Sequence, residues 1–170
     1  AIGKPCTDGE YRMQFSLWCL CGVPLMIGAD IRKLSSEMQK LLLNQELISI
    51  DQDPECRPPF LVGKRSVMVP EQDKENAVEP LRAVKDQLYT FIKHLSDNEF
   101  VIAYYNLFEE EREISCIFAD AGVPYTSGYG FAMKDIFTGE DLGLKKDYYI
   151  VSVPGHDCKL FRCRLEKFGV

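Results

Sequence analysis

The stretch Val23–Ala29, "VPLMIGA", is the feature that most constrains the fold of this chain. It contains no charged side chain, and the charged residues Asp30, Arg32 and Lys33 follow it at once. A strand without polar alternation needs apolar cover on both faces, which is unusual in a free-standing β domain and typical of parallel strands. We therefore expect a buried strand over 23–29 that ends at a polar corner, as in one βα unit of a parallel barrel.

Helix signals lie on both sides of this predicted strand. Thr7 and Glu10 have the spacing of a capping box, and Tyr11, Phe15, Trp18 and Gly22 follow at helical intervals. Downstream, Ser35 is a good N-cap, and an apolar face recurs at Met38, Leu41 and Leu42. Residues 1–59 thus predict a helix, a strand and a second helix.

The pattern changes from period 3.6 to period 2 in the second half of the chain. Residues 60–87 are rich in charge and contain several prolines, so we expect them to be a linker or loop. Residues 88–170 carry short strand patterns separated by turn residues, which favours an antiparallel sandwich or meander. The predicted strands are 89–95, 100–108, 114–119, 130–137, 148–153 and 159–165. The predicted fold class is α+β.

Charge and cysteine content exclude several classes of function. With 26 acidic and 20 basic residues, the net charge of −6 disfavours nucleic acid and anionic membranes as partners. The longest apolar stretch, Leu17–Ala29, is too short to span a bilayer. Seven cysteines without a C-x-x-C pair, and only two histidines, predict no metal site. They favour reduced, mostly buried thiols in a cytoplasmic protein.

Four stretches of the sequence carry a family resemblance: "FSLWCLCGVPLMIGADIRKLSSEMQKLLLNQELISIDQDP", "FIKHLSDNEFVIAYYN", "MKDIFTGEDLG" and "VPGHDCKLFRCRL". They resemble α-galactosidase-like enzymes of glycoside hydrolase family 27. The first is similar to the end of the catalytic barrel of these enzymes, and the other three resemble their C-terminal β-sandwich. The resemblance implies that 23–29 is barrel strand eight, that 88–170 is the sandwich, and that the parent activity is cofactor-free hydrolysis of terminal α-galactosides or related sugars.

The resemblance also implies that the catalytic groups lie outside these residues. Family members are retaining enzymes with one aspartate on barrel strand four and another on strand six, whose carboxyl groups lie about 5 Å apart across the sugar. Neither has a counterpart in residues 1–170, so we expect no catalytic residue and no activity from this chain alone. Asp51 and Asp53 resemble a pair in the sequence, but aspartates near Pro54 usually cap and turn the chain.

Asp30 is the one barrel-derived residue with a plausible place near substrate. It is a candidate for hydrogen bonding at the rim of the sugar pocket, and the alternative is a local ion pair with Arg32.

Aromatic and histidine residues of the chain favour structural roles. The tyrosines that could stack on sugar rings are Tyr104, Tyr105, Tyr125 and Tyr129. Tyr104 and Tyr105 are adjacent in a strand and must point to opposite faces, so at most one would be buried in a one-sided core. Trp18 is expected to anchor a helix. His94 and His156 have no nearby nucleophile and are expected to be structural.

A non-catalytic carbohydrate-binding or structural interaction module is the alternative function. A lone parallel strand cannot satisfy its own edge groups. We therefore expect 23–29 to be completed by a separate catalytic half, by a second copy of the chain, or by docking against the sheet.

Overall fold

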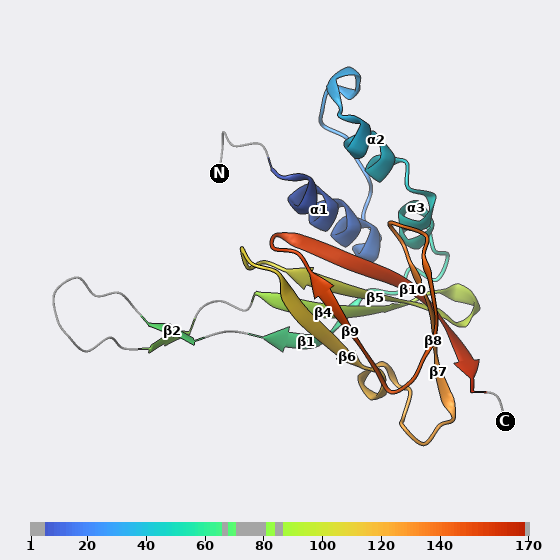
Figure 1. The fold of residues 1–170 in the computed structure, drawn as a ribbon. Coiled ribbons are helices and arrows are strands. Elements are labelled where there is room, and N and C mark those ends of the chain that lie inside the picture. The colour runs from blue at the N-terminus through green and yellow to red at the C-terminus, as the bar shows by residue number, and fades with distance from the viewer. Residues whose placement is uncertain (1–5, 66–67, 71–80, 84–86, 169–170) are drawn as a thin grey trace.

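The chain folds into an antiparallel β-sandwich that carries a small helical unit on one face (Figure 1). The computed structural model describes residues 6–65, 68–70, 81–83 and 87–168. The helices are α1 (Asp8–Cys21), α2 (Ser36–Leu42) and α3 (Gln45–Asp51), with 3-10 turns η1 (Ile31–Lys33), η2 (Ser96–Asn98) and η3 (Phe118–Ala121). The strands are β1 (Phe60–Arg65), β2 (Met68–Pro70), β3 (Leu81–Ala83), β4 (Leu88–His94), β5 (Glu99–Asn106), β6 (Arg112–Ile117), β7 (Tyr129–Asp135), β8 (Asp141–Lys145), β9 (Tyr148–Val153) and β10 (Asp157–Lys167).

A six-stranded sheet forms the centre of the molecule, in the order β1-β4-β5-β10-β7-β8 with antiparallel pairing throughout. A two-stranded sheet, β6-β9, packs on one face, and α1 and α3 pack on the other (Figure 1). One apolar cluster fills the space between the sheets, around Tyr104, Phe131 and Phe161. A second fills the space under the helices, around Leu20, Leu47 and Leu160. The central sheet therefore has apolar cores on both faces.

Helix α1 has a local capping motif at each end. The Thr7 hydroxyl accepts from the Glu10 amide at 3.2 Å, and a Glu10 carboxylate oxygen accepts from the Thr7 amide at 2.7 Å, which completes the predicted capping box. Gly22 ends the helix in the left-handed conformation, with φ of 63°. The buried side chains Phe15, Ser16, Cys19 and Leu20 face the sheet.

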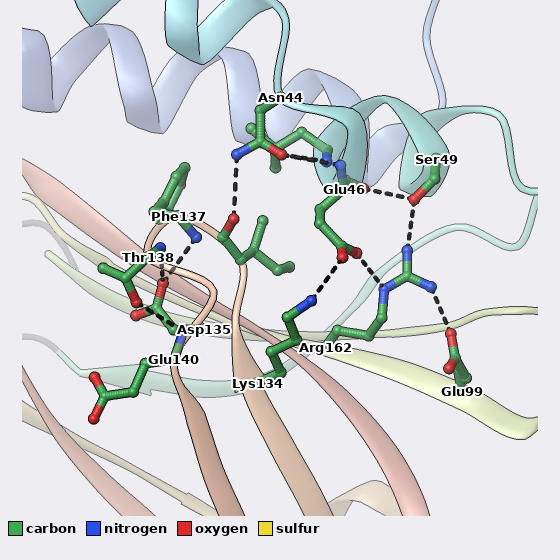
Figure 2. Close-up of polar contacts among 12 residues, drawn as sticks. Asn44, Glu46, Ser49, Glu99, Lys134, Asp135, Phe137, Thr138, Glu140 and Arg162 are labelled. Atoms are coloured by element: carbon green, nitrogen blue, oxygen red, sulfur yellow. Dashed lines mark hydrogen bonds and ion pairs between the residues drawn. The ribbon is translucent and has the colours of Figure 1, made fainter.

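Helix α3 is held on the central sheet by a polar network (Figure 2). Asn44 caps α3 through the Glu46 and Leu47 amides and donates from Nδ2 to the Ile136 carbonyl. Glu46 forms ion pairs with Lys134 of β7 at 3.1 Å and with Arg162 of β10 at 3.0 Å. Arg162 also pairs with Glu99 at 2.5 Å. The end of the helical unit is thus fixed to the middle of the sandwich.

The strand predicted over 23–29 does not form. This segment has no regular secondary structure, pairs with no strand among the described residues, and leaves Met26 80% and Ile27 55% exposed. A strand needs a neighbouring strand whose backbone groups accept and donate hydrogen bonds. The described residues supply no such neighbour for 23–29. The prediction of an apolar segment was correct, and the prediction that it is buried was wrong.

Most of the predicted strands are present in the sandwich, including the hairpin β4–β5. Four of the described strands lie where none was predicted. Phe60–Arg65 forms β1 and pairs with β4, which corrects the expected linker at its start, and Asp141–Lys145 forms β8. The short strands β2 and β3 also fall within 60–87, and residues 66–67, 71–80 and 84–86 of that range lie outside the described part of the chain.

Candidate functional site

An apolar groove lies beside the exposed segment 23–29, between α1 and α2. Its volume is about 340 Å³, and its walls include Phe15 and Trp18 of α1, Met26 and Ile27 of the segment, and Leu42 of α2. Trp18 is 40% exposed at this wall. It therefore does not anchor α1 in the core as expected. Apolar surface of this kind marks a place where another element binds.

Asp30 follows the segment and pairs with its local neighbour. Its side chain accepts from the Arg32 amide at 3.1 Å, which caps η1. Its two carboxylate oxygens also receive Nε and Nη2 of Arg32 at 2.9 and 3.0 Å. Hydrogen bonds from the Arg32 side chain and amide lower the pKa of Asp30, so it is a carboxylate at neutral pH. Ala29 and Lys33 line the groove at the same corner.

Asp51 and Asp53 have separate local surroundings. Asp53 accepts from the Ser96 amide and hydroxyl at 2.9 and 2.7 Å and from the Glu55 amide at 3.1 Å. Burial favours a higher pKa for Asp53, but these hydrogen bonds and the charge of Lys93 outweigh it and lower the pKa. Asp53 thus turns the chain, as predicted, and its hydrogen bonds to Ser96 hold this part of the chain against the β4–β5 turn. Asp51 ends α3, its Oδ1 is buried without a hydrogen-bond partner, and burial raises its pKa.

Lys93 is a buried cation that sequence reasoning missed. It is 1% exposed, and its Nζ donates to the carbonyl oxygens of Leu20 at 2.9 Å and Arg57 at 2.8 Å. The Leu20 carbonyl lies in the last turn of α1, where the helix dipole favours a positive charge. Lys93 therefore joins the end of α1 to the loop that enters the sandwich. The only sign of this buried role in the sequence is the position of Lys93 on the helix-facing side of β4.

The two histidines have structural surroundings. His94 lies between the rings of Phe60 and Phe100, at centroid distances of 5.5 and 4.7 Å. Burial, and then the charge of Arg57, lowers the pKa of His94, so its ring is neutral at pH 7. His156 occupies the turn before β10, with Nδ1 3.7 Å from a Glu10 carboxylate oxygen. Neither contacts a nucleophile in the contacts found among the described residues.

The tyrosines are divided between packing and exposure. Tyr104 and Tyr105 face opposite sides of β5 as predicted, but both are buried, at 0% and 3% exposed. The expectation that at most one could be buried was wrong because the helices cover the second face of the sheet. Tyr125 and Tyr129 are 55% and 40% exposed. No ring stacking is found between them in the described part of the chain.

All seven cysteines are free thiols, and four of them are buried: Cys19, Cys116, Cys158 and Cys163. Burial raises the pKa of Cys19, Cys116 and Cys158 to about 12 in each case, so these thiols stay protonated and unreactive. Within the described ranges, no group of three or more potential ligands could hold a metal ion. A helix long and apolar enough to cross a bilayer is also absent from those ranges.

Two family models match separate parts of the chain. The model described as "Alpha galactosidase C-terminal beta sandwich domain" matches residues 85–163, and the model described as "Alpha galactosidase A" matches residues 5–53. The boundary between the two matches falls in the region where the helical unit gives way to the sandwich.

Curated relatives are identical to the chain at about a quarter of the aligned residues. Alpha-galactosidase 3 of Arabidopsis thaliana is 27% identical over 156 residues, which cover 91% of this chain and 31% of the relative. An alpha-galactosidase of Coffea arabica is 27% identical over 155 residues, which cover 91% of this chain and 35% of the relative. The chain thus spans about a third of the length of these proteins.

Solved structures share the fold at lower identity. Alpha-galactosidase I from Mortierella vinacea superposes with a TM-score of 0.76 at 19% identity, over 95% of this chain and 37% of that one. An α-galactosidase from Saccharomyces cerevisiae with raffinose gives 0.76 at 16% identity, over 96% and 45%. A β-L-arabinopyranosidase of family GH27 from Geobacillus stearothermophilus gives 0.67 at 22% identity, over 93% and 30%. The helical unit and the sandwich therefore keep the arrangement that these larger proteins have.

Proposed function

The chain corresponds to the C-terminal part of an α-galactosidase-like protein of glycoside hydrolase family 27, and from this premise we propose that it completes a retaining glycosidase for terminal α-galactosides. In this proposal the barrel part, meaning the polypeptide that supplies the other seven βα units, carries both catalytic carboxylates. The chain contributes the last strand of the barrel, its two flanking helices and the sandwich. It is inactive alone.

The exposed apolar edge of the helical unit is the observation that carries this proposal. Met26 and Ile27 are 80% and 55% exposed, beside a groove with apolar walls. In an ordinary surface segment, apolar side chains alternate with polar ones. Segment 23–29 has no such alternation and is suited to burial on both faces. Pairing with strands of the barrel part would satisfy its backbone groups and cover its side chains. That supports a role as barrel strand eight.

Replacing Met26 by glutamate tests this docking. The isolated chain should keep its unfolding midpoint, because the side chain is 80% exposed there. Association with the barrel part should be lost, because an unpaired carboxylate would be buried between strands. Co-purification of the chain with the barrel part gives the measurement. Equal recovery of the M26E and unchanged chains would contradict the proposal. A stable dimer of the isolated chain that M26E dissociates would instead make a second copy the occupant.

We also propose that Asp30 contacts substrate at the rim of the completed sugar pocket. Its position directly after the barrel segment supports this role, and its low pKa keeps it an acceptor for sugar hydroxyl groups. In the active assembly, Asp30→Asn should raise KM more than it lowers kcat. The exposed Asp97→Asn should change neither. If Asp30→Asn leaves KM unchanged, Asp30 only caps η1.

The free thiols support a reducing compartment such as the cytoplasm as part of this proposal. An oxidising compartment would expose Cys6, Cys21 and Cys56, which are all at the surface, to disulfide formation. Mass spectrometry of the protein from its own cells, after alkylation without reductant, would show seven modified cysteines. Fewer than seven would contradict this placement.

A further inference from the structure

The helices cover only part of the face of the central sheet on which they lie (Figure 1). Helix α3 contacts β10 and β7 through Arg162 and Lys134. Helix α1 reaches β10 through the ion pair between Arg12 and Asp157, at 2.7 Å. Among the described residues, no helix lies over β1 or over the half of β4 that is farther from α1. Both strands nevertheless continue the face of the central sheet on which the helices lie.

A second groove runs along this uncovered side of α1, opposite α2. Its volume is about 560 Å³. Its floor is formed by Tyr89, Phe91, Tyr105 and Leu107 of the sheet, and Met13 and Leu17 of α1 form its wall. The rings of Tyr89 and Phe91 lie nearly parallel, at 6.2 Å and 19°, and Tyr105 meets Phe91 edge-on.

The apolar surface continues past the groove to the edge of the sheet. Leu61 of β1 pairs directly with Phe91 of β4, so the two side chains share this face. Leu61 is 45% exposed, and Leu17 and Leu107 are each 38% exposed. An antiparallel sheet can present one face to water, but that face is then polar. Apart from Lys64 of β1, which pairs with Tyr89, and the tyrosine hydroxyl groups, the sheet side chains around the groove are apolar, which indicates that something covers this part of the face.

We propose that the second groove receives the apolar face of the barrel helix that precedes α1. The inference rests on the proposed function. Helices surround a parallel barrel side by side, with axes 8–10 Å apart in general, so α1 has one helix neighbour on each side. On one side α2 and α3 fill that place. On the other side, the position of the neighbouring helix coincides with the second groove. The relatives are long enough to supply a helix at that position.

The chemistry of the groove favours a helix over a sugar. A bound sugar needs several polar partners for its hydroxyl groups, because unpaired polar groups are costly to bury. The polar groups at the groove are the side chains of Glu10, Gln14 and His156 and the hydroxyl groups of Tyr89 and Tyr105. The Tyr105 hydroxyl is already hydrogen-bonded to that of Ser16, at 3.0 Å. Glu10 is already engaged by the Thr7 amide and lies near His156. A stripe of apolar helix side chains needs no such partners. The helix would contact the sandwich directly and brace it against the barrel.

Glutamate substitutions at the rim of the groove test this inference. Leu61→Glu and Leu107→Glu place a carboxylate where the helix would lie. Ile150→Glu is the matched control, since Ile150 is 48% exposed on the outer face of β9, on the opposite sheet. All three isolated variants should unfold at the same temperature as the unchanged chain. The affinity for the barrel part, measured by titration, should fall roughly tenfold or more for the two groove variants and stay unchanged for the control.

The outcomes separate this inference from the proposed function. If the unchanged chain does not bind the barrel part, the proposed function fails. If it binds and both groove variants bind as tightly as Ile150→Glu, the inference is wrong and the function stands. Saturable binding of methyl α-galactoside to the isolated chain, lost in Tyr89→Ala, would also overturn the inference, because a sugar would then occupy the groove. So would a dimer of the isolated chain that Leu107→Glu dissociates.

Discussion

Replacing Leu20 by alanine is expected to destabilise the chain by about 3 kcal/mol. Leu20 of α1 is completely buried, in the cluster that the helices share with the central sheet. Its removal leaves a cavity that the sheet cannot close, because β5 and β10 are fixed by pairing on both edges. Urea unfolding followed by circular dichroism and by Trp18 fluorescence gives the measurement. Both signals should move together to a lower midpoint.

Leu43→Ala is the matched control, since Leu43 is 69% exposed. It should change stability by less than about 0.5 kcal/mol. The comparison also shows whether the helical unit folds as one body with the sandwich. If Leu20→Ala shifted the Trp18 signal alone, the helices and the sheet would be separate folding units, contrary to the shared core described above.

Replacing Gly155 by alanine is expected to cost about 3 kcal/mol or more, or to prevent folding. A Cβ atom at Gly155 would lie 1.9 Å from the Glu109 carbonyl oxygen and 2.9 Å from that of Phe108. Both are backbone atoms, and the Phe108 carbonyl is held by the His156 amide at 2.9 Å. The turn before β10 cannot move away without breaking that contact. Thermal unfolding measures the loss.

Gly28→Ala provides the comparison for Gly155→Ala. A Cβ at Gly28 would meet no atom within 4 Å. In the isolated chain its unfolding midpoint should therefore match that of the unchanged protein. A Gly155→Ala chain as stable as Gly28→Ala would mean that the turn is loose, and that the close approach of these two loops does not define the end of the sandwich.

Local hydrogen bonds were predictable from the sequence, and partners distant in the sequence were not. The caps at Thr7 and Ser35 are present because they need only residues three positions away. The hairpin β4–β5 is present because a turn and two alternating strands specify it. The segment 23–29 does not form a strand because no described strand pairs with it.

Several structural features escaped prediction for the same reason. Strand β1 has no clear alternation, and pairing with β4 defines it as a strand. Strand β8 is short and contains Gly143 at φ of 68°. The Arg162 network joins residues far apart in sequence, from α3, β5, β7 and β10 (Figure 2). At the candidate site, the apolar segment and Asp30 were found from the sequence, whereas Lys93 and the second groove became visible only once the helices were placed on the sheet.

Hydrolysis of an aryl α-galactoside tests the central claim most directly. The claim is that a glycosidic bond needs two carboxyl groups held on either side of it, and that this chain supplies neither. The purified chain should release product no faster than buffer, the barrel part alone should be slow, and the two together should turn over the substrate. Turnover by the chain alone, in proportion to its concentration and abolished by Asp51→Asn or Asp53→Asn, would contradict the account.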